Sequence, residues 1–167
     1  VTTWLCFQPD AASAGSTACS AESPGTTRRV SAVSYAGDIT PQQAWELLRD
    51  NPDAVLVDVR TDGEWTTIGI PDTAEVGKEP IFIEWVNNSG QRNPNFVGDL
   101  KSAGVEKGPV VFLCRSGQRS VHTAKAATAA GIEPSYNVLQ GFEGAVGPGG
   151  KRDIEGWKVL GLPWKQR

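Results

Sequence analysis

The chain has 167 residues, of which 39% are hydrophobic and 21% charged, and its formal net charge is -3. This length and composition fit one globular domain with a modest tail. The basic residues are scattered and form no cluster that could follow a phosphate backbone, so the sequence predicts no nucleic-acid partner. No apolar run approaches the roughly 20 residues of a membrane-spanning helix, so we expect no membrane partner either.

Cysteine and histidine are rare in this chain. The cysteines are Cys6, Cys19 and Cys114, and the histidine is His122. These positions lack the spacing of a metal-ligand set, and we predict neither a bound metal nor any other cofactor. A small, odd number of cysteines argues against a disulfide framework and favours a reducing, cytoplasmic location. In an oxidising compartment, Cys6 and Cys19 could instead pair with each other.

Residues 1–34 differ in composition from the rest of the chain. Between Ala11 and Thr27, every residue except Cys19 and Glu22 is Ala, Ser, Gly, Thr or Pro. Such a segment lacks the apolar surface that would offset the entropy lost on ordering. We therefore expect a flexible leader over residues 1–34 and a single domain over residues 35–167.

The first part of this domain alternates helical and strand patterns. Thr40 and Gln43 have the spacing of a capping box, which predicts the start of a helix. Residues 54–59 form a near-continuous apolar run, typical of a buried parallel strand, that closes on Asp58 and Arg60. The following elements are then expected: a helical turn over residues 62–67, a strand over residues 81–86 and a short helix over residues 94–103.

The second part is built around residues 110–113, a short apolar run typical of a buried strand. It leads into Cys114 and a polar loop, and Ser120 begins an alanine-rich helical stretch that reaches Ala130. A strand over residues 135–139 and a last short helix over residues 153–164 are expected after it. The alternation of strands and helices implies an α/β domain with right-handed crossovers and a mainly parallel sheet.

Cys114 is the candidate nucleophile, because the residues after it favour a thiolate. The candidate binding residues of this loop are Arg115, Ser116, Gly117, Gln118, Arg119 and Ser120. Its arginines are permanently charged, its glycine permits a positive φ, and its serines can donate hydrogen bonds. Backbone N–H groups ahead of the helix would complete an anion nest, so we expect a thiol pKa below the usual value of about 8.5. An inert buried cysteine would not need these neighbours.

The loop resembles the active-site loop of rhodanese-type sulfurtransferases, and the resemblance extends in the same order over residues 38–164. It is carried further by Asp58-Val59-Arg60, by Glu64-Trp65, by Asn137-Val138-Leu139-Gln140-Gly141-Phe142-Glu143-Gly144, and by Gly156-Trp157 and Gly161-Leu162-Pro163. Membership of this family implies a rhodanese-like α/β fold, with a mainly parallel five-stranded sheet and helices on both faces.

The chain departs from the family pattern at the expected rim of the pocket. Residues 68–73 read Ile-Gly-Ile-Pro-Asp-Thr where the family usually has Gly-His-Ile-Pro-Gly-Ala, and Gln140 replaces the first glycine of Gly-Gly-Phe. Both changes lie away from the nucleophile in the sequence. They bear on the shape of the rim, and hence on the substrate, more than on the chemistry.

The resemblance implies a thiosulfate sulfurtransferase that works by double displacement. The Cys114 thiolate would attack the outer sulfur of a small-molecule donor such as thiosulfate, releasing sulfite and leaving a persulfide on the cysteine. A thiol or cyanide, or a thiol on an acceptor protein, would then take that sulfur. The loop amides, Arg115 and Arg119 would stabilise the anions.

Two other functions remain open at this point. A sulfur-relay or binding module with little thiosulfate turnover would use the same cysteine and differ in its partner. A cysteine phosphatase or arsenate reductase is disfavoured, because such phosphatases have a longer spacing between cysteine and arginine than the four residues between Cys114 and Arg119.

Two residues outside the loop are candidates for supporting roles. Asp58 and Arg60 are expected beside the loop, where they would either brace it or form an ordinary salt bridge at the end of a strand. For His122 a solvent-facing or capping role is expected, because a thiolate that cations already stabilise needs no general base.

Overall fold

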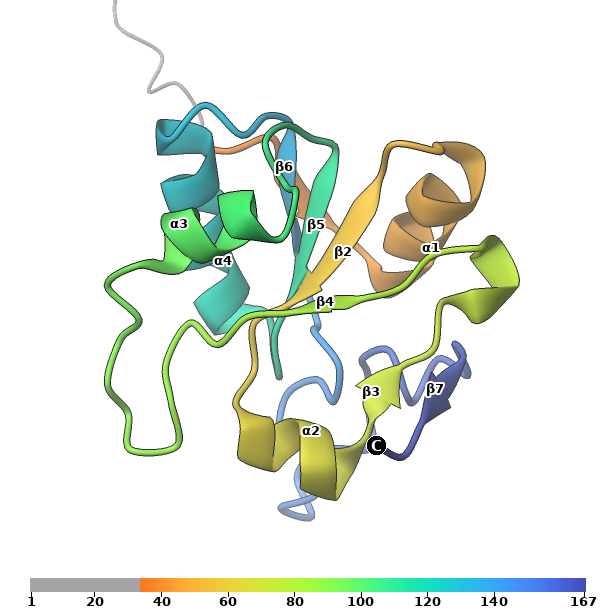
Figure 1. Ribbon diagram of the computed structural model, residues 1–167. Coiled ribbons are helices and arrows are strands. Elements are labelled where there is room, and N and C mark those ends of the chain that lie inside the picture. Colours follow the sequence, from red (N-terminus) through yellow and green to blue (C-terminus); the bar gives the residue numbers. More distant parts are fainter. Residues whose placement is uncertain (1–33) are drawn as a thin grey trace, which may run out of the picture. The chain divides into compact units, whose positions relative to one another are not determined.

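A five-stranded sheet forms the centre of the computed structural model, which describes residues 34–167 (Figure 1). Its order is β1-β6-β5-β2-β4, and every neighbouring pair is parallel. The strands are β1 (Gly37–Ile39), β2 (Val55–Asp58), β4 (Ile81–Phe82), β5 (Val110–Leu113) and β6 (Ser135–Val138). The expected α/β class and parallel sheet are confirmed. The predicted leader covers residues 1–34, and all of it except residue 34, including Cys6 and Cys19, lies outside the described part.

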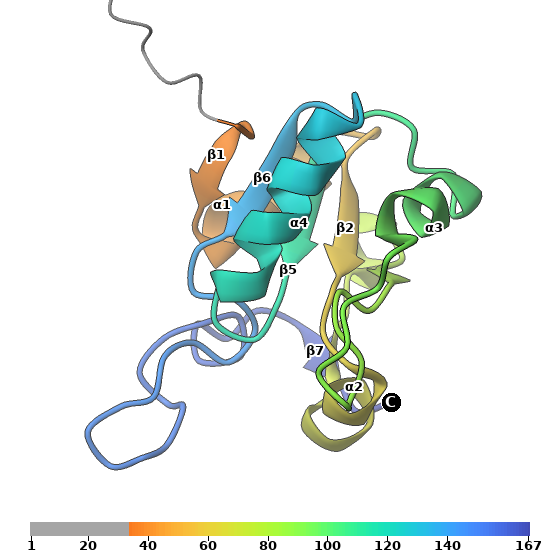
Figure 2. The same cartoon turned by 90° about the vertical axis from the view of Figure 1, so that its left-hand side faces the viewer.

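Helices cover both faces of the sheet, as expected. α1 (Pro41–Asp50) lies on one face, while α3 (Phe96–Ser102) and α4 (Gln118–Ala129) lie on the other (Figures 1 and 2). Successive side chains of β5 alternate between the two cores: Phe112 packs in the core with α3 and α4, and Leu113 in the core with α1. This alternation follows from the two-residue period of a strand that is buried on both sides.

Capping boxes fix the starts of two helices. The Thr40 hydroxyl accepts a hydrogen bond from the Gln43 amide, and the Gln43 side chain accepts one from the Thr40 amide. Thr61 and Glu64 repeat the arrangement at the start of α2 (Asp62–Ile68). The predicted helix start at Thr40 and the predicted helical turn at residues 62–67 are both confirmed.

The expected strand over residues 81–86 is shorter in the structure. Regular pairing ends at Phe82, although the amides of Ile83 and Trp85 still donate to the carbonyls of Asp58 and Val59. The side chains of Ile83 and Trp85 are buried in the core that also contains α3 and α4 residues. The helix expected over residues 94–103 begins at Phe96 and ends at Ser102.

The helix expected over residues 153–164 is wrong. This segment is a series of turns, because Gly156 and Gly161 have φ values of 103° and 73°, which a right-handed helix does not allow. Trp157 is buried, whereas Val159 and Leu160 are exposed.

The last strand pairs with a strand from much earlier in the sequence. β7 (Trp164–Lys165) is antiparallel to β3 (Ile70–Pro71), and a single 3-10 turn, η1 (Ala74–Val76), follows β3. No helix in residues 34–167 is long and apolar enough to cross a bilayer.

Candidate active site

Cys114 directly follows β5, at the carboxyl edge of the sheet. At this end of the sheet, β2 lies beside β5, and Asp58 of β2 is in register with Leu113 of β5. The cysteine is only 1% exposed, so its sulfur lies inside the protein behind the loop. Open parallel sheets place their ligand sites at this edge, where strands end and loops begin.

Two carbonyl groups of the loop accept hydrogen bonds from the segment that follows β6 in the chain. The amides of residues 142–144 donate to the carbonyl oxygens of Cys114 and Arg115 over 2.8 to 3.1 Å. A side chain at Gly141 would lie 2.5 Å from the Cys114 carbonyl oxygen, so glycine is needed for this close approach. With the carbonyls occupied on this side, the Gly117 amide turns inward and donates to Cys114 Sγ at 3.1 Å.

Gly117 has the predicted positive φ, with a value of 85°. It is the N-cap of α4, which begins at Gln118 and not at Ser120 as the sequence suggested. A Cβ atom at position 117 would lie 1.9 Å from the Leu139 carbonyl oxygen. Both the backbone conformation and the space therefore require glycine here.

Uncharged groups, and not guanidinium groups, make the direct contacts to the sulfur. The Ser120 hydroxyl lies 3.1 Å from Sγ, the same distance as the Gly117 amide nitrogen. Ser116 is half-buried and Gln118 is exposed, and within the described chain neither forms a hydrogen bond with Sγ. His122 is exposed, as expected.

Both loop arginines are paired with carboxylates, which the sequence did not predict. Arg119 makes two hydrogen bonds to Glu64, at 2.8 and 2.7 Å, and Arg115 Nε contacts Glu143 at 2.6 Å. The expectation that Arg115 and Arg119 stabilise the anions of the reaction stays a prediction.

The pair between Glu64 and Arg119 shifts the pKa of both partners. Burial alone would raise the pKa of Glu64, but hydrogen bonds from Arg119 and from the Thr61 amide outweigh burial and lower it. For Arg119, burial acts to lower the pKa, and the contact with Glu64 raises it overall. The pair thus holds α2 to the loop as two charged groups.

Asp58 and Arg60 form a second, fully buried pair. Both side chains are 0% exposed, and Arg60 Nη2 lies 2.6 Å from an oxygen of Asp58. Nη2 also donates to the Gly69 carbonyl at 2.9 Å, and the guanidinium carbon lies 4.0 Å from the centre of the Phe142 ring. Arg60 thus contacts the ring of Phe142, whose amide donates to the Cys114 carbonyl, and a bracing role for the pair stays a prediction.

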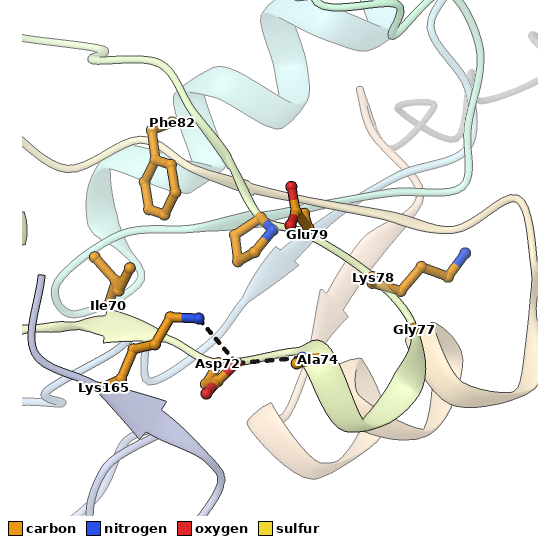
Figure 3. Close-up of a pocket in the computed structure, with 9 residues that line it drawn as sticks. Ile70, Asp72, Ala74, Gly77, Lys78, Glu79, Phe82 and Lys165 are labelled. Carbon is orange, nitrogen blue, oxygen red and sulfur yellow. Dashed lines mark hydrogen bonds and ion pairs between the residues drawn. The ribbon is translucent and has the colours of Figure 1, made fainter.

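The altered segment at residues 68–73 is covered by the end of the chain. A Cβ atom at Gly69 would lie 2.8 Å from both the Lys165 carbonyl and the Trp164 ring, so β7 occupies the space that a histidine would need there. Lys165 also forms an ion pair with Asp72 at 3.2 Å (Figure 3). A cavity of about 480 Å³ lies beside these residues, and no residue of the Cys114 loop lines it (Figure 3).

Several contacts of the site come from residues to which the sequence analysis gave no role in it. Glu64 and Glu143 bind the arginines, and the Ser120 hydroxyl is 2.5 Å from Asn137 Oδ1. The carboxamide of Asn137 is one available signal, because it is a polar group inside a predicted strand.

The fold and the loop together define a rhodanese-like domain. The family model "Rhodanese-like domain" matches residues 40–146, which is more than half of the chain, and the chain belongs to this family.

Known relatives span most of the described domain. The crystal structure of Rv0390 from M. tuberculosis superposes with a TM-score of 0.74 at 52% identity, covering 80% of this chain and 99% of that one. An uncharacterized protein of Rickettsia conorii, RC0915, is 37% identical over 130 residues, covering 77% of this chain and 96% of the relative. The thiosulfate sulfurtransferase GlpE of Glaesserella parasuis is 35% identical over 109 residues, covering 65% of this chain and 85% of GlpE.

Proposed function

We propose that the protein is a sulfurtransferase that moves sulfane sulfur from a donor such as thiosulfate to a thiol or cyanide through a persulfide on Cys114. The observation that carries this proposal is the surroundings of Sγ, which sits at the end of β5 with the Gly117 amide and the Ser120 hydroxyl each 3.1 Å away. The similarity to the thiosulfate sulfurtransferase GlpE supports thiosulfate as the donor.

The reaction consists of two displacements on sulfur. The Cys114 thiolate attacks the outer sulfur of thiosulfate, a new S–S bond forms at Sγ, and sulfite leaves with the electron pair of the old bond. A thiolate or cyanide then attacks the outer sulfur of the persulfide. The Cys114 thiolate is the leaving group, so the cysteine is regenerated without an added oxidant or reductant.

The loop supplies a neutral hydrogen-bond donor, the Gly117 amide, to the charge that develops on the sulfur atoms. The Gly117 amide is fixed in direction, because residues 142–144 hold the carbonyls of the loop. Donors that are oriented before the reaction stabilise an anion without reorganising during it. This arrangement suits a negative charge that moves between Sγ and an attached sulfur.

Phosphatase chemistry is less well supported. Both terminal nitrogens of Arg119 are engaged by Glu64, at 2.8 and 2.7 Å, so the loop arginine is not free to form a fork with phosphate oxygens. A sulfur-relay role would use the same displacements with a protein persulfide as the donor.

Intact-protein mass spectrometry tests the proposal directly. Incubation with thiosulfate should add one sulfur atom, about 32 Da, and cyanide should remove it. The Cys114→Ser variant is the matched control and should gain nothing. A gain with a persulfidated donor protein but not with thiosulfate would assign the relay role. No gain with either donor would overturn the proposal.

A further inference from the structure

A continuous series of hydrogen bonds connects the Cys114 sulfur to the edge strand of the sheet. Ser120 Oγ lies 3.1 Å from Sγ and 2.5 Å from Asn137 Oδ1. Asn137 Nδ2 lies 2.7 Å from Asp38 Oδ1, which also accepts from the Tyr35 hydroxyl at 2.9 Å. Asp38 and Asn137 are paired in register between β1 and β6, so the sheet itself holds this contact.

Asp38 determines which way the amide of Asn137 faces. A carboxylate only accepts hydrogen bonds, so the Asn137 NH2 group must face Asp38 and its carbonyl oxygen must face Ser120. The opposite orientation would place the amide oxygen against the carboxylate at 2.7 Å. Asn137 is only 1% exposed, so water is not available to relieve that repulsion.

The orientation of Asn137 then determines what Ser120 offers to the sulfur. A hydroxyl group has one proton, and at 2.5 Å from the Asn137 oxygen that proton lies between the two oxygens. Ser120 therefore presents a lone pair to Sγ, which suits a protonated thiol. To donate to a thiolate, the hydroxyl must leave Asn137 and expose a buried carbonyl oxygen without a partner.

We propose that Asp38 is a positioning residue that acts through Asn137 to direct the Ser120 hydroxyl away from Cys114, favouring the thiol over the thiolate. Removing the carboxylate allows the Asn137 amide to turn. Its NH2 group can then donate to Ser120 Oγ, while the Ser120 hydroxyl donates to the thiolate. Asp38, which is exposed, thus restrains the reactivity of a buried cysteine across two strands of the sheet.

The pH profile of Cys114 alkylation tests this proposal. With iodoacetamide, the pH at which alkylation reaches half its maximal rate should be about one unit lower in Asp38→Asn than in the wild type. A shift of this size corresponds to one hydrogen bond to a charged sulfur. Asp38→Ala should shift the midpoint in the same direction. It excludes the possibility that the new asparagine side chain of Asp38→Asn forms its own hydrogen bond with Asn137. An unchanged or higher midpoint in both folded variants would overturn the proposal.

A double-mutant cycle separates the hydrogen-bonded route from a simple charge effect. In the Ser120→Ala background no hydroxyl remains to redirect, so adding Asp38→Asn should move the midpoint by only about 0.2 pH unit, through screened charge alone. An equal shift in both backgrounds would show that Asp38 acts through space, which also contradicts the proposal. Asp53→Asn, which removes an exposed charge just before β2, a strand separated from β1 by β6 and β5, controls for net charge.

The other charged groups near the series stay constant in these variants. Around the loop they are the pairs of Arg119 with Glu64, Arg115 with Glu143 and Arg60 with Asp58, and near Asp38 they are Tyr35 and Lys125, whose nitrogen lies 6.0 Å from the Tyr35 ring. The inference rests on the proposed function only in taking Cys114 as the reactive group. Alkylation needs no sulfur donor, so failure of the mass experiment and failure of this one are distinguishable.

Discussion

The contact between Glu64 and Arg119 offers a sharp test of how the loop is held. Glu64→Gln removes the charge but keeps the capping box, because glutamine serves equally well at the N3 position of α2. The side chains are 14% and 24% exposed, so solvent screens the pair only in part. After allowing for that screening, we expect the variant to lose about 1 to 2 kcal/mol of unfolding free energy near neutral pH.

The loss should depend on pH in a defined direction. The pKa of Glu64 is lowered in the folded protein from its usual value of 4.5. A lowered pKa means that the folded state holds the ionised form more strongly, so the contribution to stability is complete above the usual pKa. It disappears as the pH falls through the lowered value. The wild type and Glu64→Gln should therefore approach each other in stability in acid.

Thermal unfolding of the two proteins at about pH 7 and about pH 3 measures this difference. We expect the variant to melt about 3 to 8 °C lower near neutrality and closer to the wild type in acid. Glu46→Gln, at an exposed position of α1, is the matched control and should change little. A deficit that is equal at both pH values would refute the assignment of an ionised, stabilising pair.

Two further predictions concern the backbone and the buried charge next to the loop. Gly117 and Gly104 share a φ of 85°, but only Gly117 has an atom in the way, the Leu139 oxygen at 1.9 Å. In urea unfolding, Gly117→Ala should lose more than about 3 kcal/mol of unfolding free energy and Gly104→Ala about 1 kcal/mol. Equal losses would show that the Leu139 oxygen does not obstruct a side chain at position 117. Arg60→Lys should cost about 2 to 4 kcal/mol, because lysine cannot reproduce a two-bond contact to the buried Asp58 carboxylate. A loss under about 1 kcal/mol would show that this pair does not support the sheet edge.

Features that depend on neighbouring residues could be predicted from the sequence. The start of α1 follows from Thr40 and Gln43, and β5 follows from four consecutive apolar residues. The positive φ of Gly117 follows from a tight turn between a strand and a helix. Each of these is decided by local sterics and hydrogen bonding, which a short stretch of sequence contains in full.

Features that depend on distant partners could not be predicted. Arg119 is 55 residues from Glu64, and Arg115 is 28 residues from Glu143. The sequence around the loop therefore does not indicate which carboxylate binds either arginine. A guanidinium fork binds a carboxylate more strongly than it binds a single sulfur, and the fold brings the carboxylates within reach. The last expected helix failed for a related reason, since Trp157 donates its amide to the distant Gly141 carbonyl.

The two loop arginines differ in how easily an anionic donor can recruit them. Arg119 uses two nitrogens against both oxygens of Glu64, and its side chain is 24% exposed. Arg115 contacts Glu143 through Nε, and its side chain is 41% exposed. The Glu143 carboxylate is 15% exposed and the Glu64 carboxylate 14%, so leaving either one unpaired is costly. Because Arg115 contacts Glu143 through Nε, its terminal nitrogens can meet a sulfonate while that pair stays intact, whereas Arg119 would have to leave Glu64 to do so. We therefore expect Arg115 to meet the donor while Arg119 holds α2 to the loop, a division of roles that the spacing of the two residues does not reveal.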